Sequence, residues 1–148
     1  MTYSEFINRP LDLMQRIEHK IEDVQFKWTL CLNTIQGDGE KIQKSLTNTA
    51  EVRVLRYAEA NRELTDLQEE YDASCANVRD FLYGCLDVKD ADVLDWKYCS
   101  GKSIADIAEI RGVTYSGMAS RISRAETKAR AEFSRYFQNC VDLQKKRR

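Results

Sequence analysis

Residues 90–133 read DADVLDWKYCSGKSIADIAEIRGVTYSGMASRISRAETKARAEF, and this stretch predicts three helices separated by two short breaks. Asp90 is placed to cap a first helix that runs to Tyr98. Gly101 would end that helix, because glycine adopts the left-handed backbone conformation at little cost. The apolar face of this helix is formed by Val93, Leu94 and Tyr98.

The second and third helices are joined by a turn centred on glycine. Ser103 occupies an N-cap position, with Asp106 three residues later, where a capping box requires an acceptor. In the turn, Gly112 supplies a positive φ, Val113 is expected to plug the core, and Thr114 caps the third helix. The residues expected to face the core are Ile104, Ile107, Ala108, Met118, Ile122, Ala125 and Ala129.

Two longer helices are predicted upstream, each with apolar residues at alternating spacings of three and four. The first is expected from Pro10, which suits a first helical turn, to Gln36, and the second from Glu51 to Gly84 or Leu86. The polar residues 37–50 are expected to form a loop, in which Gly37, Asp38 and Gly39 stop the first helix. The two stripes comprise Met14, Ile17, Ile21, Val24, Trp28, Cys31 and Ile35, and then Tyr57, Ala60, Leu64, Leu67, Tyr71, Ser74, Val78, Phe81 and Cys85.

Together these patterns predict an all-α protein. Residues 1–86 would form a long antiparallel, coiled-coil-like helical hairpin, and residues 87–148 a three-helix helix-turn-helix domain with a basic tail at Lys145–Arg148. Two narrow stripes bury little surface, so the hairpin is expected to dimerise or to bind a partner. Phe26 and Leu32 flank the first stripe, and together with Trp28 they are candidates for that contact, although all three also suit an ordinary core.

The near-neutral net charge of −1 conceals an asymmetry. Residues 1–89 hold 11 Lys/Arg against 16 Asp/Glu, whereas residues 111–148 hold 10 against 3. A basic end on an otherwise acidic chain is typical of a surface that faces phosphate, although a basic terminal run can also be merely solvated.

The sequence shows no pattern that is typical of a metal-binding, disulfide-rich, membrane or enzymatic protein. The five cysteines show no CxxC pairing and His19 is alone, so we expect neither a metal site nor a disulfide framework, and no cofactor. No apolar run is long enough to span a membrane, and no secretion signal is visible at the start of the sequence, so a bacterial cytoplasmic location is expected. No nucleophile–base pair, carboxylate pair or phosphate loop indicates an enzyme.

The third helix carries the predicted DNA site, because short polar side chains flanked by arginine suit a helix that lies in a groove. Residues near its N-terminus would face the bases, and hydroxyls, helix N-termini and cations would hold phosphates. The expected base-facing residues are Tyr115, Ser116, Gly117, Ala119 and Ser120, and the expected phosphate contacts are Ser103, Thr114, Arg121, Arg124 and Lys128. For the three cations, an alternative is a solvated face with intrahelical pairing near Glu126.

The stretch SIADIAEIRGVTYSGMASRISRA resembles region four of bacterial sigma factors, which reads the −35 promoter element. The matching residues are Ile107-Ala108, Gly112-Val113-Thr114 and residues 120–125. The layout of the whole chain resembles phage late-operon activators of the ArpU/RinA type, with Lys97-Tyr98 at the place of their Arg/Lys-Tyr dipeptide. This resemblance implies a phage- or prophage-encoded transcriptional regulator that binds double-stranded DNA, with host RNA polymerase as a further partner.

The chain departs from the sigma-like pattern at the reading positions, where small residues replace side chains that make bidentate base contacts. Affinity would then rest on phosphates, DNA shape or a dimer with two half-sites, unless sequence reading has decayed. Gly117 inside a helix suggests close approach of the backbone to DNA. Two alternative functions stay open: a small terminase subunit for DNA packaging, or a helical module that binds polymerase or a sigma factor without reading DNA.

Overall fold

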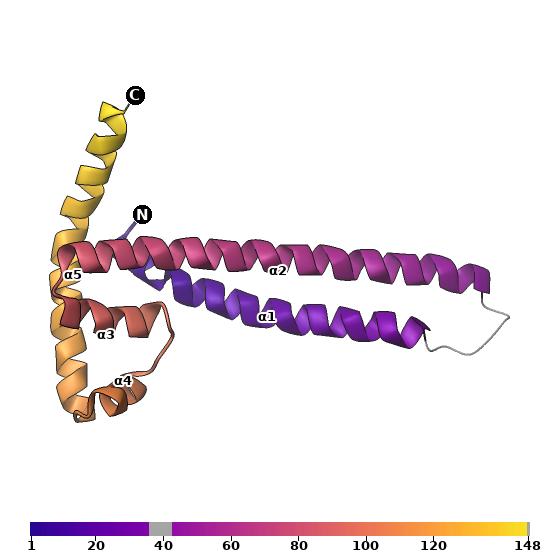
Figure 1. The fold of residues 1–148 in the computed structure, drawn as a ribbon, viewed down its shortest axis with the longest axis horizontal. Helices are drawn as coiled ribbons and strands as arrows, with labels where there is room; N and C mark the ends of the chain where they lie inside the picture. The colour runs from indigo at the N-terminus through magenta and orange to yellow at the C-terminus, as the bar shows by residue number, and fades with distance from the viewer. Residues whose placement is uncertain (36–42, 148) are drawn as a thin grey trace. The chain divides into compact units, whose positions relative to one another are not determined.

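The computed structural model describes residues 1–35 and 43–147, which form five α-helices and, within these ranges, no strand (Figure 1). The helices are α1 (Tyr3–Ile35), α2 (Gln43–Cys85), α3 (Val88–Tyr98), α4 (Ile104–Arg111) and α5 (Tyr115–Lys146). The described chain is therefore all-α, as its sequence predicts.

These helices are shared between two compact units. One unit combines Met1–Leu11 with Ala73–Arg148, and the other is Asp12–Asp72. The predicted division between residues 86 and 87 instead falls inside the first unit, between α2 and α3. The difference arises because the start of α1 and the end of α2 carry buried apolar side chains that pack with α5.

A cluster of aromatic rings forms the centre of the first unit. Phe81 of α2 is fully buried, and its ring lies 5.7 Å from that of Phe6, 5.7 Å from that of Phe133 and 6.5 Å from that of Tyr3. All three contacts are edge-on, the geometry that aromatic quadrupoles favour. Full burial of a side chain of this size contributes roughly 1.5–3 kcal/mol to stability. Residues from both distant parts of the sequence thus hold this unit together.

The start of α1 differs from the prediction. The helix begins at Tyr3, because Thr2 and Glu5 form a reciprocal cap: the Thr2 amide donates to Glu5 at 2.7 Å, and the Glu5 amide donates to the Thr2 hydroxyl at 3.2 Å. This pattern is the capping box of Thr or Ser followed three residues later by Glu. Pro10 consequently lies inside α1 and not in its first turn, where its missing amide would have cost nothing.

The loop expected over residues 37–50 is wrong in its second half, since α2 already begins at Gln43. The expected stop at Gly37-Asp38-Gly39 lies outside the described residues. Polar composition suggested a loop there, but polar residues such as Gln, Lys and Glu are also good helix formers.

In the second unit, residues of α1 contact residues of α2, and the contacts that lie further along α1 lie earlier along α2. Lys20 forms an ion pair with Glu63, and the Trp28 and Tyr57 rings lie 5.1 Å apart. Such pairing means that the two helices run antiparallel over these residues. Several large apolar side chains remain exposed nearby, including Phe26 at 63%.

Candidate nucleic-acid interface

Helices α3, α4 and α5 pack against one another in the first unit. Leu94 of α3, Ile107 of α4 and Met118 of α5 are all buried, and so are Ile122, Ala125 and Ala129 at the predicted spacing along α5. The buried faces of these helices match the prediction, except that Ile104 is only half-buried.

The connection between α4 and α5 is short and fixed at both ends. At the start of α4, the Ser103 hydroxyl accepts from the Asp106 amide at 3.2 Å and Asp106 accepts from the Ser103 amide at 3.3 Å, which completes the predicted capping box. At its end, Gly112 adopts φ 65°, a conformation that favours glycine. These features confirm Ser103 as the N-cap of α4 and Gly112 as a residue of positive φ.

Two details of the prediction are wrong. Val113 is 47% exposed and does not enter the core, whose buried residues on either side of the turn are Ile107, Ala108 and Met118. Asp90 does not cap α3, which begins at Val88 with Asp87 in the N-cap position. Asp90 instead lies in the first turn of α3, where its carboxylate is available to cations of α5.

The start of α5 is built around Thr114 and Gly117. The Thr114 hydroxyl accepts a hydrogen bond from the Gly117 amide at 3.2 Å and so caps the helix as predicted. A Cβ atom at position 117 would lie 3.0 Å from that hydroxyl oxygen, closer than most real Cβ contacts. Glycine at this position is therefore explained by the cap, without requiring close approach of DNA to the backbone.

Most residues predicted to face bases are accessible. Tyr115 is 58% exposed, and Ser116, Gly117 and Ser120 are also exposed, whereas Ala119 is half-buried. No acidic residue occurs in the first turn of α5. The first two turns therefore offer small polar side chains and helix N-terminal amides to an anionic partner.

The three predicted phosphate-binding cations gather on one flank of α5. Lys128 donates to the Asp90 carboxylate at 2.9 Å, and the Arg121 Nε lies 3.7 Å from the other carboxylate oxygen. Arg124 donates to the backbone carbonyl of Ser120 at 3.4 Å. The four side chains Asp90, Arg121, Arg124 and Lys128 line a surface pocket of about 250 Å³. Asp90 is a member of this site that the sequence did not indicate.

The two predicted hydroxyl contacts have different surroundings. Thr114 uses its oxygen as an acceptor in the cap, so its hydroxyl hydrogen can still be donated to a phosphate. Ser103 is equally exposed, but the Asp106 carboxylate sits at the same helix terminus and would repel an anion. Thr114 is thus the better placed of the two.

The hydrogen bonds of Glu126 come from α3 and not from Arg121, Arg124 or Lys128, contrary to the alternative considered for these cations. Its carboxylate accepts from Lys97 at 2.7 Å and from the hydroxyl of Tyr98, so the Lys97-Tyr98 dipeptide ties α3 to α5. Burial opposes ionisation of Glu126, but the hydrogen bonds from Lys97 and Tyr98 outweigh it and lower the pKa of this carboxyl. Burial, together with the bond to Glu126, raises the pKa of Tyr98 well above its usual range.

Arg111, at the end of α4, contacts one aromatic ring and one carboxylate of α3 that the sequence did not link to it. Its guanidinium lies 4.9 Å from the Trp96 ring centroid and donates to Asp92 at 3.3 Å, while the Tyr83 hydroxyl donates to the same carboxylate at 2.6 Å. These contacts fix α4 relative to α3 and to the end of α2.

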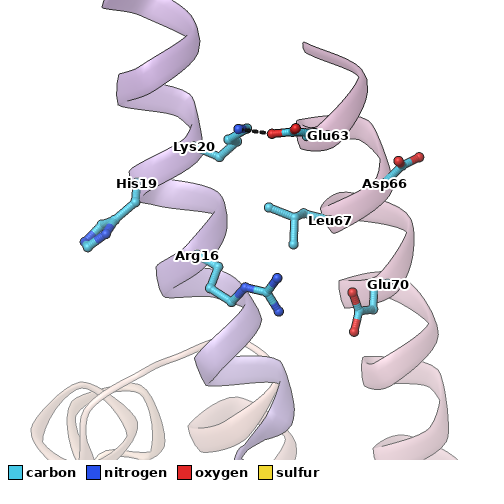
Figure 2. Close-up of a pocket in the computed structure, with 7 residues that line it drawn as sticks. All are labelled: Arg16, His19, Lys20, Glu63, Asp66, Leu67 and Glu70. Atoms are coloured by element: carbon cyan, nitrogen blue, oxygen red, sulfur yellow. Dashed lines mark hydrogen bonds and ion pairs between the residues drawn. The ribbon is translucent and has the colours of Figure 1, made fainter. Parts of the chain in front are cut away.

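The second unit has a larger pocket, of about 540 Å³, between α1 and α2 (Figure 2). Arg16 and Lys20 extend from α1 toward α2, and Lys20 meets Glu63, whereas His19 points away. The pocket is lined by Arg16, His19, Lys20, Glu63, Asp66, Leu67 and Glu70. Its three carboxylates make it unsuitable for phosphate, and its opposite charges on facing helices favour the antiparallel register.

The cysteines form no disulfide in the described part of the chain. Cys99 is buried, with its sulfur 3.9 Å from the carbonyl oxygen of Cys75, and burial raises the pKa of its thiol. A thiol held protonated in this way is a poor nucleophile and metal ligand.

Within residues 1–35 and 43–147, no group of three or more His, Cys, Asp or Glu is placed to bind a metal ion. No helix in these ranges has the length and apolarity to cross a membrane.

Comparison of this chain with family models, with curated proteins and with solved structures found no match.

Proposed function

We propose that this protein is a DNA-binding transcriptional regulator and that α3, α4 and α5 form a helix-turn-helix whose third helix enters the major groove. The observation that carries the proposal is the connection between α4 and α5. Gly112, in its left-handed conformation, turns the chain so that Thr114 starts a helix anchored by Met118 but exposed at Tyr115 and Ser116. Two packed helices joined by a short glycine-containing turn are the parts of a DNA-binding helix-turn-helix.

The charges of α5 also support this face of the helix as the DNA-binding surface. The first eleven residues of α5, Tyr115–Ala125, contain two arginines and no carboxylate. Arg124 is exposed and donates to the neutral backbone carbonyl of Ser120, so its charge is available to a phosphate. Because small side chains occupy four of the five base-facing positions, phosphate contacts and DNA shape would supply most of the affinity.

A salt titration with matched variants tests the proposal. Binding of wild type to labelled duplex DNA would be followed by fluorescence anisotropy between 50 and 200 mM salt, where four to six phosphate contacts should give a steep loss of affinity. Arg124→Ala should weaken binding equally for all sequences and reduce the salt slope by about one. Arg62→Ala removes the same charge from an exposed site in the other unit and should change neither quantity.

Selection from random duplexes tests whether Arg121 and Arg124 contact phosphates or bases. We expect wild type and Arg121→Ala/Arg124→Ala to select the same sequences, with lower affinity for the double variant. Failure of wild type to bind any duplex at 50 mM salt would overturn the DNA-binding proposal and favour a module that contacts polymerase or a sigma factor directly.

We further propose that the Asp12–Asp72 unit joins two copies, which would supply two weak half-sites. Phe26, Val54 and Leu55 of this unit are large apolar side chains that are more than half exposed in one copy, and a second copy could bury them. Native mass spectrometry tests the number of copies. A dimer supports a regulator, whereas eight or more copies would favour a small terminase subunit.

The resemblance to sigma region four and to late-operon activators leads us to propose that the DNA site is a promoter in a phage or prophage, in a bacterial cytoplasm. Transcription from such a promoter by bacterial RNA polymerase, with and without this protein, would show whether it activates. Unchanged transcription from a DNA fragment that the protein binds would contradict this role.

A further inference from the structure

The Asp90 carboxylate of α3 lies among the three cations Arg121, Arg124 and Lys128 on one flank of α5. The Asp90 side chain is 13% exposed, while that of its partner Lys128 is 58% exposed. Asp90 contacts Lys128 at 2.9 Å and Arg121 at 3.7 Å, and Arg124 completes the lining of the same pocket. One carboxylate among three cations leaves this pocket with a formal charge of +2.

The chemistry of this pocket suits one phosphate group. Guanidinium groups present several N–H donors in a plane and an ammonium supplies three more, which together can satisfy the oxygens of a phosphodiester. Asp90 already accepts from Lys128 and attracts Arg121, so an incoming phosphate has to share or replace these interactions. It also has to approach a second negative charge.

We propose that this pocket holds one backbone phosphate of duplex DNA and that Asp90 competes with that phosphate for Arg121 and Lys128. The inference rests on the proposed DNA-binding function and adds a residue that sets its affinity. In the free protein, Asp90 holds the two cations together and neutralises one of them. In the complex, the phosphate takes these donors and Asp90 weakens the binding.

The size of the expected change in DNA affinity follows from the charges of Asp90 and the phosphate. Two unit charges about 5 Å apart in water repel strongly enough to change a binding constant about fourfold. Removal of the competing carboxylate also frees one further cation to release a counterion on binding. The slope of log affinity against log salt should then become steeper by about 0.9.

The test compares Asp90→Asn with Asp80→Asn. Both variants remove one carboxylate from the same unit, but Asp80 is an exposed residue of α2 whose charge acts on Tyr136, which lies eight residues along α5 from Lys128 and fifteen from Arg121. At 1.5 Å per residue, these separations are about 12 Å and about 22 Å. We expect Asp90→Asn to bind duplex DNA about fourfold more tightly at 50 mM salt with a steeper slope, and Asp80→Asn to change affinity less than twofold.

A double variant tests whether the gain in DNA affinity of Asp90→Asn arises in this pocket. Asp90→Asn/Lys128→Gln should lose the gain of Asp90→Asn, because the freed donor is gone. Circular dichroism melting checks that each variant folds, and Asp90→Ser replaces Asp90→Asn if the amide disturbs α3.

The outcomes separate this inference from the proposed function. Wild-type binding together with unchanged or weaker binding by a folded Asp90→Asn would overturn the competitor role and leave DNA binding intact. An equal gain in Asp80→Asn would also overturn it, since the effect would then be one of net charge. If neither wild type nor Asp90→Asn binds duplex DNA at 50 mM salt, the proposed function itself fails.

Free phosphate is the other source of the same ligand chemistry. Calorimetric titration with inorganic phosphate should show no binding in the millimolar range, because one free anion lacks the remaining DNA contacts. Saturable binding of inorganic phosphate by Asp90→Asn without any gain for duplex DNA would contradict the assignment to the DNA backbone.

Discussion

The Tyr98 hydroxyl donates to the carboxylate of Glu126, and this bond joins the end of α3 to the middle of α5. Lys97 donates to the same carboxylate, so two consecutive residues converge on one partner. Tyr3 lies close enough to Glu126 for the two side chains to interact electrostatically. Its own buried hydroxyl, however, has no hydrogen-bond partner among the described residues. Two tyrosines in one unit thus differ in whether their hydroxyl is satisfied.

A pair of Tyr→Phe substitutions exploits this difference. Tyr98→Phe should lower the free energy of unfolding by about 1.5 kcal/mol, because it removes a hydrogen bond to a charged acceptor that retains Lys97. Tyr3→Phe should leave stability unchanged or raise it by up to about 1 kcal/mol, because it removes an unpaired buried polar group. Urea unfolding measures both, and equal losses in the two variants would contradict the assigned hydrogen bonding.

Glu126 should make stability depend on acid pH. Its pKa is lower in the folded protein than its usual value of 4.5, so its contribution is fully present above that value and is lost as the pH falls through the folded pKa. We expect wild type to exceed Glu126→Gln in stability at pH 7 and the difference to shrink below about pH 4.5. Unfolding curves from pH 7 to pH 3 measure this difference, and a constant difference throughout would rule out the ionised pair as its cause.

Gly117 should respond to substitution according to its neighbour Thr114. Gly117→Ala alone should not stabilise the protein, because the gain in helix propensity is offset by displacement of the capping hydroxyl, 3.0 Å from the new Cβ. In a Thr114→Ala background the hydroxyl is absent, and the same substitution should stabilise by about 0.5 kcal/mol. Thermal melts of the four proteins measure the coupling, and stabilisation by Gly117→Ala in both backgrounds would show that the contact is harmless.

The aromatic cluster should dominate the stability of the first unit. Phe81→Ala should cost about 3–5 kcal/mol, and Phe6→Ala should also cost several kcal/mol, because both rings are buried against Phe133. Leu143→Ala removes an apolar side chain from an exposed position of α5 and should change stability by less than about 0.5 kcal/mol. Urea unfolding of the three variants, followed by the loss of helical circular dichroism, tests the ranking. A small effect of Phe6→Ala would mean that residues 1–11 are not part of this core.

Local patterns were sufficient to predict the helices near the candidate site. The spacing of Met118, Ile122 and Ala125 identified the buried face of α5, and Ser103 with Asp106 marked the start of α4, because each signal spans only one or two helical turns. Pro10 misled the prediction for the opposite reason. A local rule favours proline in a first turn, but the cap at Thr2 and burial of the residues after it extend α1 past that rule.

Interactions between residues far apart in sequence could not be predicted. Asp90 pairs with Lys128 across 38 positions, and Glu126 binds Tyr98 across 28. Neither pairing leaves a periodic signal, since each depends on how α3 packs on α5. The same holds for Phe6 beside Phe133, which is why the sequence placed the domain boundary after residue 86.

The contact of Phe6 with Phe81 and Phe133 also affects how the protein folds during its synthesis. The ribosome releases residues 3–10 long before it makes α5, and α1 and α2 of the Asp12–Asp72 unit emerge in between. The first unit can therefore close only after translation has passed Phe133, and until then Phe6 and Phe81 remain accessible to chaperones or to other nascent chains. Contacts of such long sequence separation also slow folding, so the candidate DNA-binding surface would be completed last.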